Sequence, residues 1–149
     1  MSEATLVTYP GITFASISQP AHFSELPTVI PALIHKVIAA VGPAIVGPPQ
    51  VYYSEWETES GKVAVGFPVT DGTPAQVGVD VRTIPAGEGI MFTHEGPYTE
   101  MKNGWMTAMA ATNATGRAKI DLAWEDYVTD PDSVAPTDLK TDIYVALEK

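Results

Sequence analysis

The sequence predicts an α+β fold: a tandem β-α-β-β repeat with pseudo-twofold symmetry, in which an antiparallel sheet carries two helices on one face around a central cleft. Three observations lead to this prediction. Short stretches with alternating apolar side chains recur along the chain, two windows have apolar residues at helical spacing, and similar residues recur at a fixed offset of 75 positions. We expect one domain over residues 1–149, with repeats over about 4–70 and about 79–148.

The first repeat is predicted to contain four strands and one helix. Strand patterns are found in TLVTYPG, ITFASIS, VYYSEWE and KVAVGFPV. Between the second and third strands, Ser24 offers an N-cap, and apolar residues follow helical spacing over residues 29–41. Pro31 predicts a kink or a delayed start of the regular helix, and Gly42 predicts its end.

The second repeat shows the same order of elements. DVRTIPA aligns with TLVTYPG, IMFTHEGPYTEM with ASISQPAHFSEL, and WEDYVTD, which runs into an Asp-Pro turn at residues 130–131, with PQVYYSE. Thr99 is expected to cap a second helix that ends at Gly116. TDIYVAL then aligns with VAVGFPV after a proline-rich loop. The alignment predicts that Glu125 takes the place of Gln50.

Strand alternation assigns the side chains to the two faces of the sheet. In the last strand, isoleucine and valine fall on the face expected under the helices, and Tyr144 falls on the other face. Glu125 and Tyr127 are assigned to the face of Tyr144, with Gln50 and Tyr52 in the matching places. The central ligand cleft would then hold one carboxylate among tyrosines. Such a site suits a flat or cationic organic molecule, through stacking and cation–π attraction of about 0.5–2 kcal/mol per ring.

Each of these residues also has a purely structural interpretation. A glutamate in a strand most often faces solvent, and tyrosines at alternate strand positions usually pack on a sheet with a wet hydroxyl. Trp105 lies on the apolar face of the second helix. It is a candidate ligand contact, but a tryptophan in that position is more often a core residue.

Composition excludes several kinds of partner and site. With 18 acidic and 8 basic residues the net charge is −10, so no nucleic-acid partner is expected. The chain has no cysteine and its three histidines lack metal-ligand spacing, so no metal is expected. No nucleotide-binding or nucleophile motif occurs, and no cofactor is expected. The start of the chain lacks an export signal and the apolar stretch 29–41 is too short to span a bilayer, which favours a cytoplasmic protein without a membrane partner.

Three stretches resemble a known family. WEDYVTDP, IPAGEGIMFTHEGPY and the C-terminal TDIYVAL are similar to the GyrI-like small-molecule-binding domain, the effector-binding domain of several AraC- and MerR-type regulators, with a SOUL-like fold. The resemblance covers nearly the whole chain. It implies that Glu125 lies at the centre of an aromatic-lined cleft and that Tyr144 is the family's tyrosine of the last strand. Ala146 departs from the family, which often has a proline there, and no helix-turn-helix fits beside the domain.

The resemblance implies two functions for the same residues. The first is a stand-alone protein that captures aromatic, cationic small molecules through Glu125 and stacking tyrosines. The alternative is a hydrolase, because some similar proteins hydrolyse cyclopropane-bearing DNA-alkylating natural products; Glu125 would then activate water and Tyr144 would hold the acceptor oxygen. Two further alternatives are haem binding, which the absence of CxxCH disfavours, and binding of a partner protein.

Overall fold

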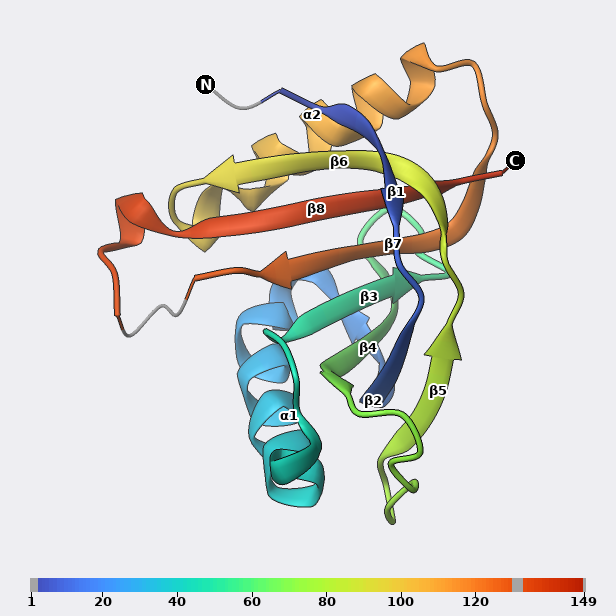
Figure 1. Ribbon diagram of the computed structural model, residues 1–149. Coiled ribbons are helices and arrows are strands. Elements are labelled where there is room, and N and C mark those ends of the chain that lie inside the picture. The colour runs from blue at the N-terminus through green and yellow to red at the C-terminus, as the bar shows by residue number, and fades with distance from the viewer. Residues whose placement is uncertain (1–2, 130–132, 149) are drawn as a thin grey trace. The chain divides into compact units, whose positions relative to one another are not determined.

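The structure is a computed structural model that describes residues 3–129 and 133–148 (Figure 1). The Asp-Pro turn predicted at residues 130–131 lies outside the described residues. The described residues form eight strands and two α-helices, and every strand is antiparallel to the strands with which it pairs inside its unit. The predicted α+β class is confirmed. The chain divides into two compact units, Gly11–Pro85 (the 11–85 unit) and Met1–Pro10 with Ala86–Lys149 (the split unit).

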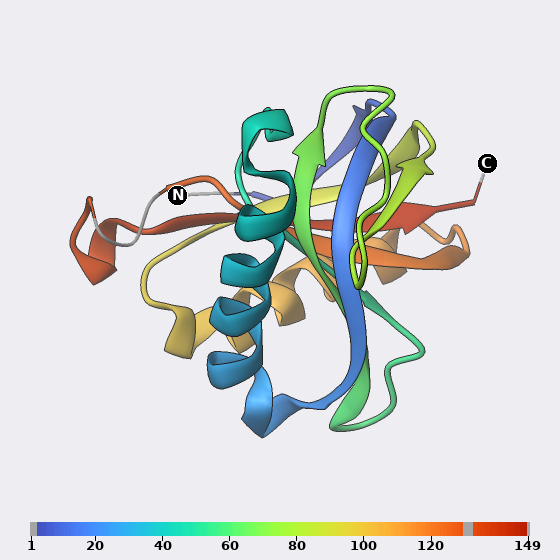
Figure 2. The ribbon, with the colours of Figure 1, turned by 90° about the horizontal axis from the view of Figure 1, so that it is seen from below.

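The 11–85 unit is a four-stranded sheet with one helix against it. Its strands follow the sheet order β3 (Gln50–Ser54), β4 (Ser60–Val69), β2 (Ile12–His22) and β5 (Asp80–Ile84). Helix α1 (Leu26–Val41) lies against β2 and β4, as Figure 2 shows, between the 3-10 turns η1 (Phe23–Glu25) and η2 (Gly42–Ala44).

The split unit has the same composition of elements. Its strands follow the sheet order β1 (Thr5–Tyr9), β6 (Gly87–Glu95), β8 (Lys140–Leu147) and β7 (Lys119–Tyr127). Helix α2 (Met101–Ala114) lies against β6 and β8, after the 3-10 turn η3 (Tyr98–Glu100); a further turn, η4 (Pro136–Asp138), precedes β8. The helix ends as predicted before Gly116, which has a φ of +70°.

The element bounds follow the 75-residue offset as far as the helices. β1 starts at Thr5 and β5 at Asp80, while α1 starts at Leu26 and α2 at Met101. The same separation holds for η1 and η3. The compact units, however, are not the two repeats, because β1 pairs with β6 and β5 pairs with β2. Each unit therefore contains the leading strand of the other repeat.

The two predicted helix caps are wrong in the same way. Ser24 and Thr99 lie inside the 3-10 turns η1 and η3 that precede the helices. His22 caps η1 instead: its Nδ1 accepts a hydrogen bond from the Ser24 N–H, and the Glu25 carboxylate accepts one from the His22 N–H. A 3-10 turn has no apolar stripe of its own, so the sequence pattern places the start of ordered structure too late.

Helix α1 is the most apolar segment of the chain. Pro31 lies inside it, so the regular helix is not delayed until after this proline. By length and composition alone the segment Phe23–Ala44 could cross a membrane. In the structure, however, Val37 and Val41 pack with Ala15, Phe67, Val69 and Val79 in the core of the 11–85 unit.

Candidate ligand-binding site

Glu125 faces helix α2. On β7, Glu125 is opposite Ile143 of β8, and Trp124 is opposite Tyr144. Residues directly opposite in an antiparallel pair share a face of the sheet. Ile143 packs in the core cluster with Ala108 of α2, so the side chain of Glu125 lies on the face that α2 covers. Tyr144 lies on the opposite face, and the prediction that the two share a face is wrong.

The error has a simple physical cause. Alternation within one strand shows which of its side chains share a face. It does not show which side chains of the neighbouring strand lie on that same face. That choice depends on the pairing register, and the β7–β8 register is irregular between Lys119 and Ala123. The bulk of Trp124 favoured the helix face in the sequence, whereas in the structure this ring packs on the other side of the sheet.

Glu125 is a buried carboxylate whose two oxygens both accept hydrogen bonds. Its side chain is 4% exposed. Oε2 accepts from the indole N–H of Trp105 at 2.6 Å, and Oε1 accepts from the Tyr127 hydroxyl at 3.0 Å. The ring of Tyr98, itself 40% exposed, lies 5.5 Å from that of Tyr127. Aromatic residues of α2 and β7 thus bond to the acid, and Tyr98 of η3 packs against the one on β7.

The opposite face of the same sheet carries an aromatic stack. The rings of Trp124 and Tyr144 lie 4.8 Å apart and nearly parallel, and Tyr9 packs edge-on against Trp124 at 5.0 Å. Burial, together with the negative charges of Asp126 and Asp142, raises the pKa of Tyr144 to about 12. This tyrosine therefore holds its proton at neutral pH, in a cluster whose contacts are those of sheet packing.

Gln50 and Tyr52 form a similar contact in the 11–85 unit. The Tyr52 hydroxyl donates to Oε1 of Gln50 at 3.3 Å, as the Tyr127 hydroxyl does to Glu125 two residues before it. The Tyr52 ring packs against Phe14 at 4.7 Å. Both repeats therefore place a tyrosine two positions after a polar side chain and join the two.

The faces of these two contacts differ. Val51 is opposite Val65, and Val65 shares a face of β4 with Phe67, two residues further on, which packs against α1. Val51 therefore faces α1. Gln50 and Tyr52 consequently face away from the helix of their unit, whereas Glu125 faces its helix. The prediction that Glu125 takes the place of Gln50 is wrong, because the offset between repeats changes by an odd number of residues between the helices and these strands.

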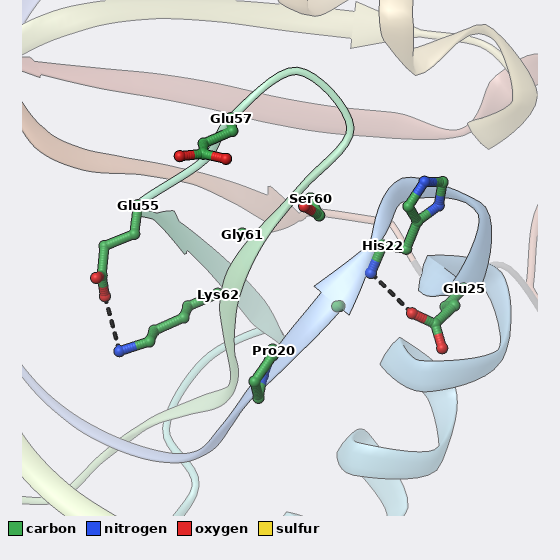
Figure 3. A pocket seen from close by; sticks show the side chains of 9 residues that line it. Pro20, His22, Glu25, Glu55, Glu57, Ser60, Gly61 and Lys62 are labelled. Carbon is green, nitrogen blue, oxygen red and sulfur yellow. Dashed lines mark hydrogen bonds and ion pairs between the residues drawn. The ribbon is translucent and has the colours of Figure 1, made fainter.

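An open hollow lies at the tip of the β3–β4 hairpin (Figure 3). His22 and Glu25 line it on one side, and Glu55, Glu57 and Lys62 on the other. Lys62 forms an ion pair with Glu55 at 2.8 Å, which raises the pKa of Lys62. Glu55 and Glu57 are exposed. Within residues 3–129 and 133–148, no group of three histidine or carboxylate side chains is arranged to hold a metal ion.

The sequence profile of the GyrI-like small molecule binding domain matches residues 2–148. The chain belongs to this family. No curated protein matches the sequence significantly. The resemblance seen in WEDYVTDP and the two other stretches is thereby confirmed for almost the whole GyrI-like chain.

Solved structures share the GyrI-like fold. The chain is similar to the EcmrR C-terminal domain, with a TM-score of 0.84, 20% identity, and coverage of 100% of this chain and 99% of that one. It is similar to SAV2435 bound to tetraphenylphosphonium (TM-score 0.73, 10% identity, 98% and 94% covered). It is also similar to a hydrolase encoded by lin2189 from Listeria innocua (TM-score 0.62, 13% identity, 98% and 92% covered). At these identities the likeness shows the fold alone.

Of the site residues predicted for this GyrI-like domain, the structure brings three together in the split unit: Glu125, Tyr127 and Trp105. Tyr144 is on the far face of the same sheet, and Gln50 with Tyr52 belongs to the other unit. Sequence reasoning missed Tyr98. The only available signal was its alignment with Phe23, another aromatic residue at the start of a 3-10 turn.

Proposed function

We propose that this small-molecule-binding domain captures aromatic cations at Glu125, beneath helix α2 of the split unit. The observation that carries the proposal is the buried carboxylate of Glu125, with Trp105 and Tyr127 bonded to its two oxygens. A charge is expensive to bury, and a carboxylate kept among aromatic rings is more simply explained by a ligand than by packing.

The chemistry of the surroundings supports a cation with an aromatic body. Aromatic faces attract cations, and a nearby carboxylate adds the opposite full charge. Trp105 and Tyr127 contact the acid, and the exposed Tyr98 extends the aromatic surface toward solvent. The net charge of −10 favours the approach of a cation. The similar protein SAV2435 was solved with tetraphenylphosphonium, a cation with four aromatic rings.

Each residue has a distinct role in this proposal. Glu125 supplies the negative charge, Tyr127 orients its carboxylate from the same strand, and Trp105 is the half-buried side chain that a ligand must contact or displace. The participation of Gln50, Tyr52 and Tyr144 stays a prediction. Tyr144 could act only from the face of the sheet opposite to Glu125.

The test is a titration of the wild type and of Glu125→Gln, monitored by tryptophan fluorescence. The two ligands are tetraphenylphosphonium and the neutral compound triphenylphosphine oxide. Loss of the buried charge should weaken binding of the cation tenfold or more, and should change binding of the neutral compound little. Glu57→Gln, at an exposed acid, is the control and should bind as wild type does. Equal affinity of Glu125→Gln and wild type for the cation would refute the proposal.

A hydrolase is the second candidate, supported by the similarity to a protein described as a hydrolase and by the contact between Glu125 and Tyr127. In this version Glu125 orients water for attack on a strained ring, and Tyr127 takes the role that the sequence assigned to Tyr144. Mass spectrometry of mixtures with a cyclopropane-bearing alkylating compound separates the candidates. A hydrated product formed by wild type but not by Glu125→Gln would establish turnover.

The proposal includes a cytoplasmic location and no binding of nucleic acid by this chain. The excess of acidic residues repels phosphate backbones, so a gel-shift assay with random duplex DNA at low salt should show no complex. A shifted band would contradict this part of the proposal.

A further inference from the structure

Thr141 is a buried polar residue that the contacts of the fold leave unexplained. Its side chain is fully buried in β8, and among the described residues its hydroxyl has no hydrogen-bond partner. Nearly all buried hydroxyl groups in native proteins have a partner, in the protein, in an ordered water or in a ligand. The unpaired hydroxyl of Thr141 therefore indicates that a hydrogen-bonding atom from a water molecule or a ligand lies beside it.

Strand pairing places Thr141 next to the Glu125 site. Thr141 is directly opposite Tyr127 on β7 and His94 on β6, so the three lie in one row on the face covered by α2. Tyr127 in turn donates to Glu125. Glu125 and Thr141 are diagonal neighbours on adjacent strands, a relationship that separates two positions by about 7–8 Å.

One turn of α2 contacts Glu125 and the strand neighbours of Thr141. Gly104 packs on His94 of this row and on Ile143, the partner of Glu125: a Cβ there would lie 3.1 Å from His94 Nδ1 and 2.9 Å from Ile143 Cδ1. The next residue, Trp105, donates to Glu125. A ligand that reaches Glu125 by displacing the indole of Trp105 therefore enters beside the row that contains Thr141.

We propose that Thr141 is a second recognition point of this site, and that the ligands are aromatic cations with a hydrogen-bonding group on the far side of the ring. This inference rests on the proposed function. A hydroxyl, amide or carbonyl group fits, because the threonine hydroxyl both donates and accepts. The span of one substituted ring matches the spacing between Glu125 and Thr141.

The test uses a matched pair of probes, phenyltrimethylammonium and (4-hydroxyphenyl)trimethylammonium, which differ by one hydroxyl group. Their affinities are measured by calorimetry for wild type, Thr141→Val and Thr112→Val. Valine has the shape of threonine without its hydroxyl. Thr112 is the control, because it is equally buried in the split unit but its hydroxyl donates to the Ala108 carbonyl.

We expect the hydroxyl group to strengthen binding to wild type and to Thr112→Val roughly threefold to tenfold. In Thr141→Val this gain should vanish, while the parent cation binds as it does to wild type. An equal gain in Thr141→Val, or no gain in wild type, would overturn the inference and show that the hydroxyl meets at most an internal water. Failure of the parent cation to bind wild type would refute the proposed function, and this inference with it.

Discussion

The indole N–H of Trp105 lies 2.6 Å from Oε2 of Glu125 and joins helix α2 to strand β7 inside the split unit. A hydrogen bond to a buried charged group contributes more to stability than one between neutral groups. The same contact makes Trp105 both a part of the fold and a cover over the acid.

Trp105→Phe should lower the free energy of unfolding by about 1.5–3 kcal/mol, because the aromatic ring remains but the donor to Glu125 is lost. The measurement is urea denaturation, repeated in a Glu125→Gln background to form a double-mutant cycle. In that background the cost of Trp105→Phe should be smaller. An unchanged cost would mean that Trp105 acts through packing alone.

The two tyrosine contacts should differ in strength. Tyr127→Phe removes a donor to a carboxylate and should cost about 1.5–3 kcal/mol, whereas Tyr52→Phe removes a longer bond to the neutral amide of Gln50 and should cost about 0.5–1.5 kcal/mol. Chemical denaturation of the two variants provides the comparison. A larger loss in Tyr52→Phe would contradict the assignment of Glu125 as the charged partner.

Tyr144 should make the protein less stable in strong alkali. Its pKa is raised from 10.0 to about 12, so above pH 10 the folded state retains a proton that the unfolded state releases. This contribution to stability is complete below pH 10 and is lost as the pH rises toward 12. Absorbance titration of tyrosinate should show a late component that Tyr144→Phe lacks, and denaturation at several pH values should show a weaker decline in that variant.

Gly66→Ala should disrupt the 11–85 unit. A Cβ on Gly66 would lie 1.8 Å from the Ala15 carbonyl oxygen, so backbone rather than a side chain would have to move. We expect a loss of about 3 kcal/mol, the upper end of the usual range for overpacking, read from the midpoint of thermal or urea unfolding. Gly42→Ala is the control, since its nearest neighbour would be the Ile38 side chain at 3.9 Å and its backbone is helical. Similar losses in both variants would contradict the argument.

The sequence was sufficient for the order of the elements and for their spacing as far as the helices, because Pro10 and Pro85 and the apolar periods of these elements recur 75 positions apart. It was insufficient for the helix starts, where His22 rather than Ser24 is the cap. It also placed Glu125 on the wrong face, since that depends on its pairing with Ile143 in another strand. The contact between Trp105 and Glu125 could not be predicted from the sequence either, because the two residues are 20 positions apart and lie on a helix and a strand.

The exchange of leading strands determines which fragments of the chain are complete. A cut in the linker near residue 75 would separate β5 from β2 and remove Val79 from its core neighbours Val37 and Val41. A fragment of residues 11–85 keeps all four strands and the helix of one unit. Truncation and limited proteolysis should therefore find the stable boundaries in the turns after β1 and β5. Each of these strands belongs to one repeat but pairs in the unit that contains the helix of the other repeat.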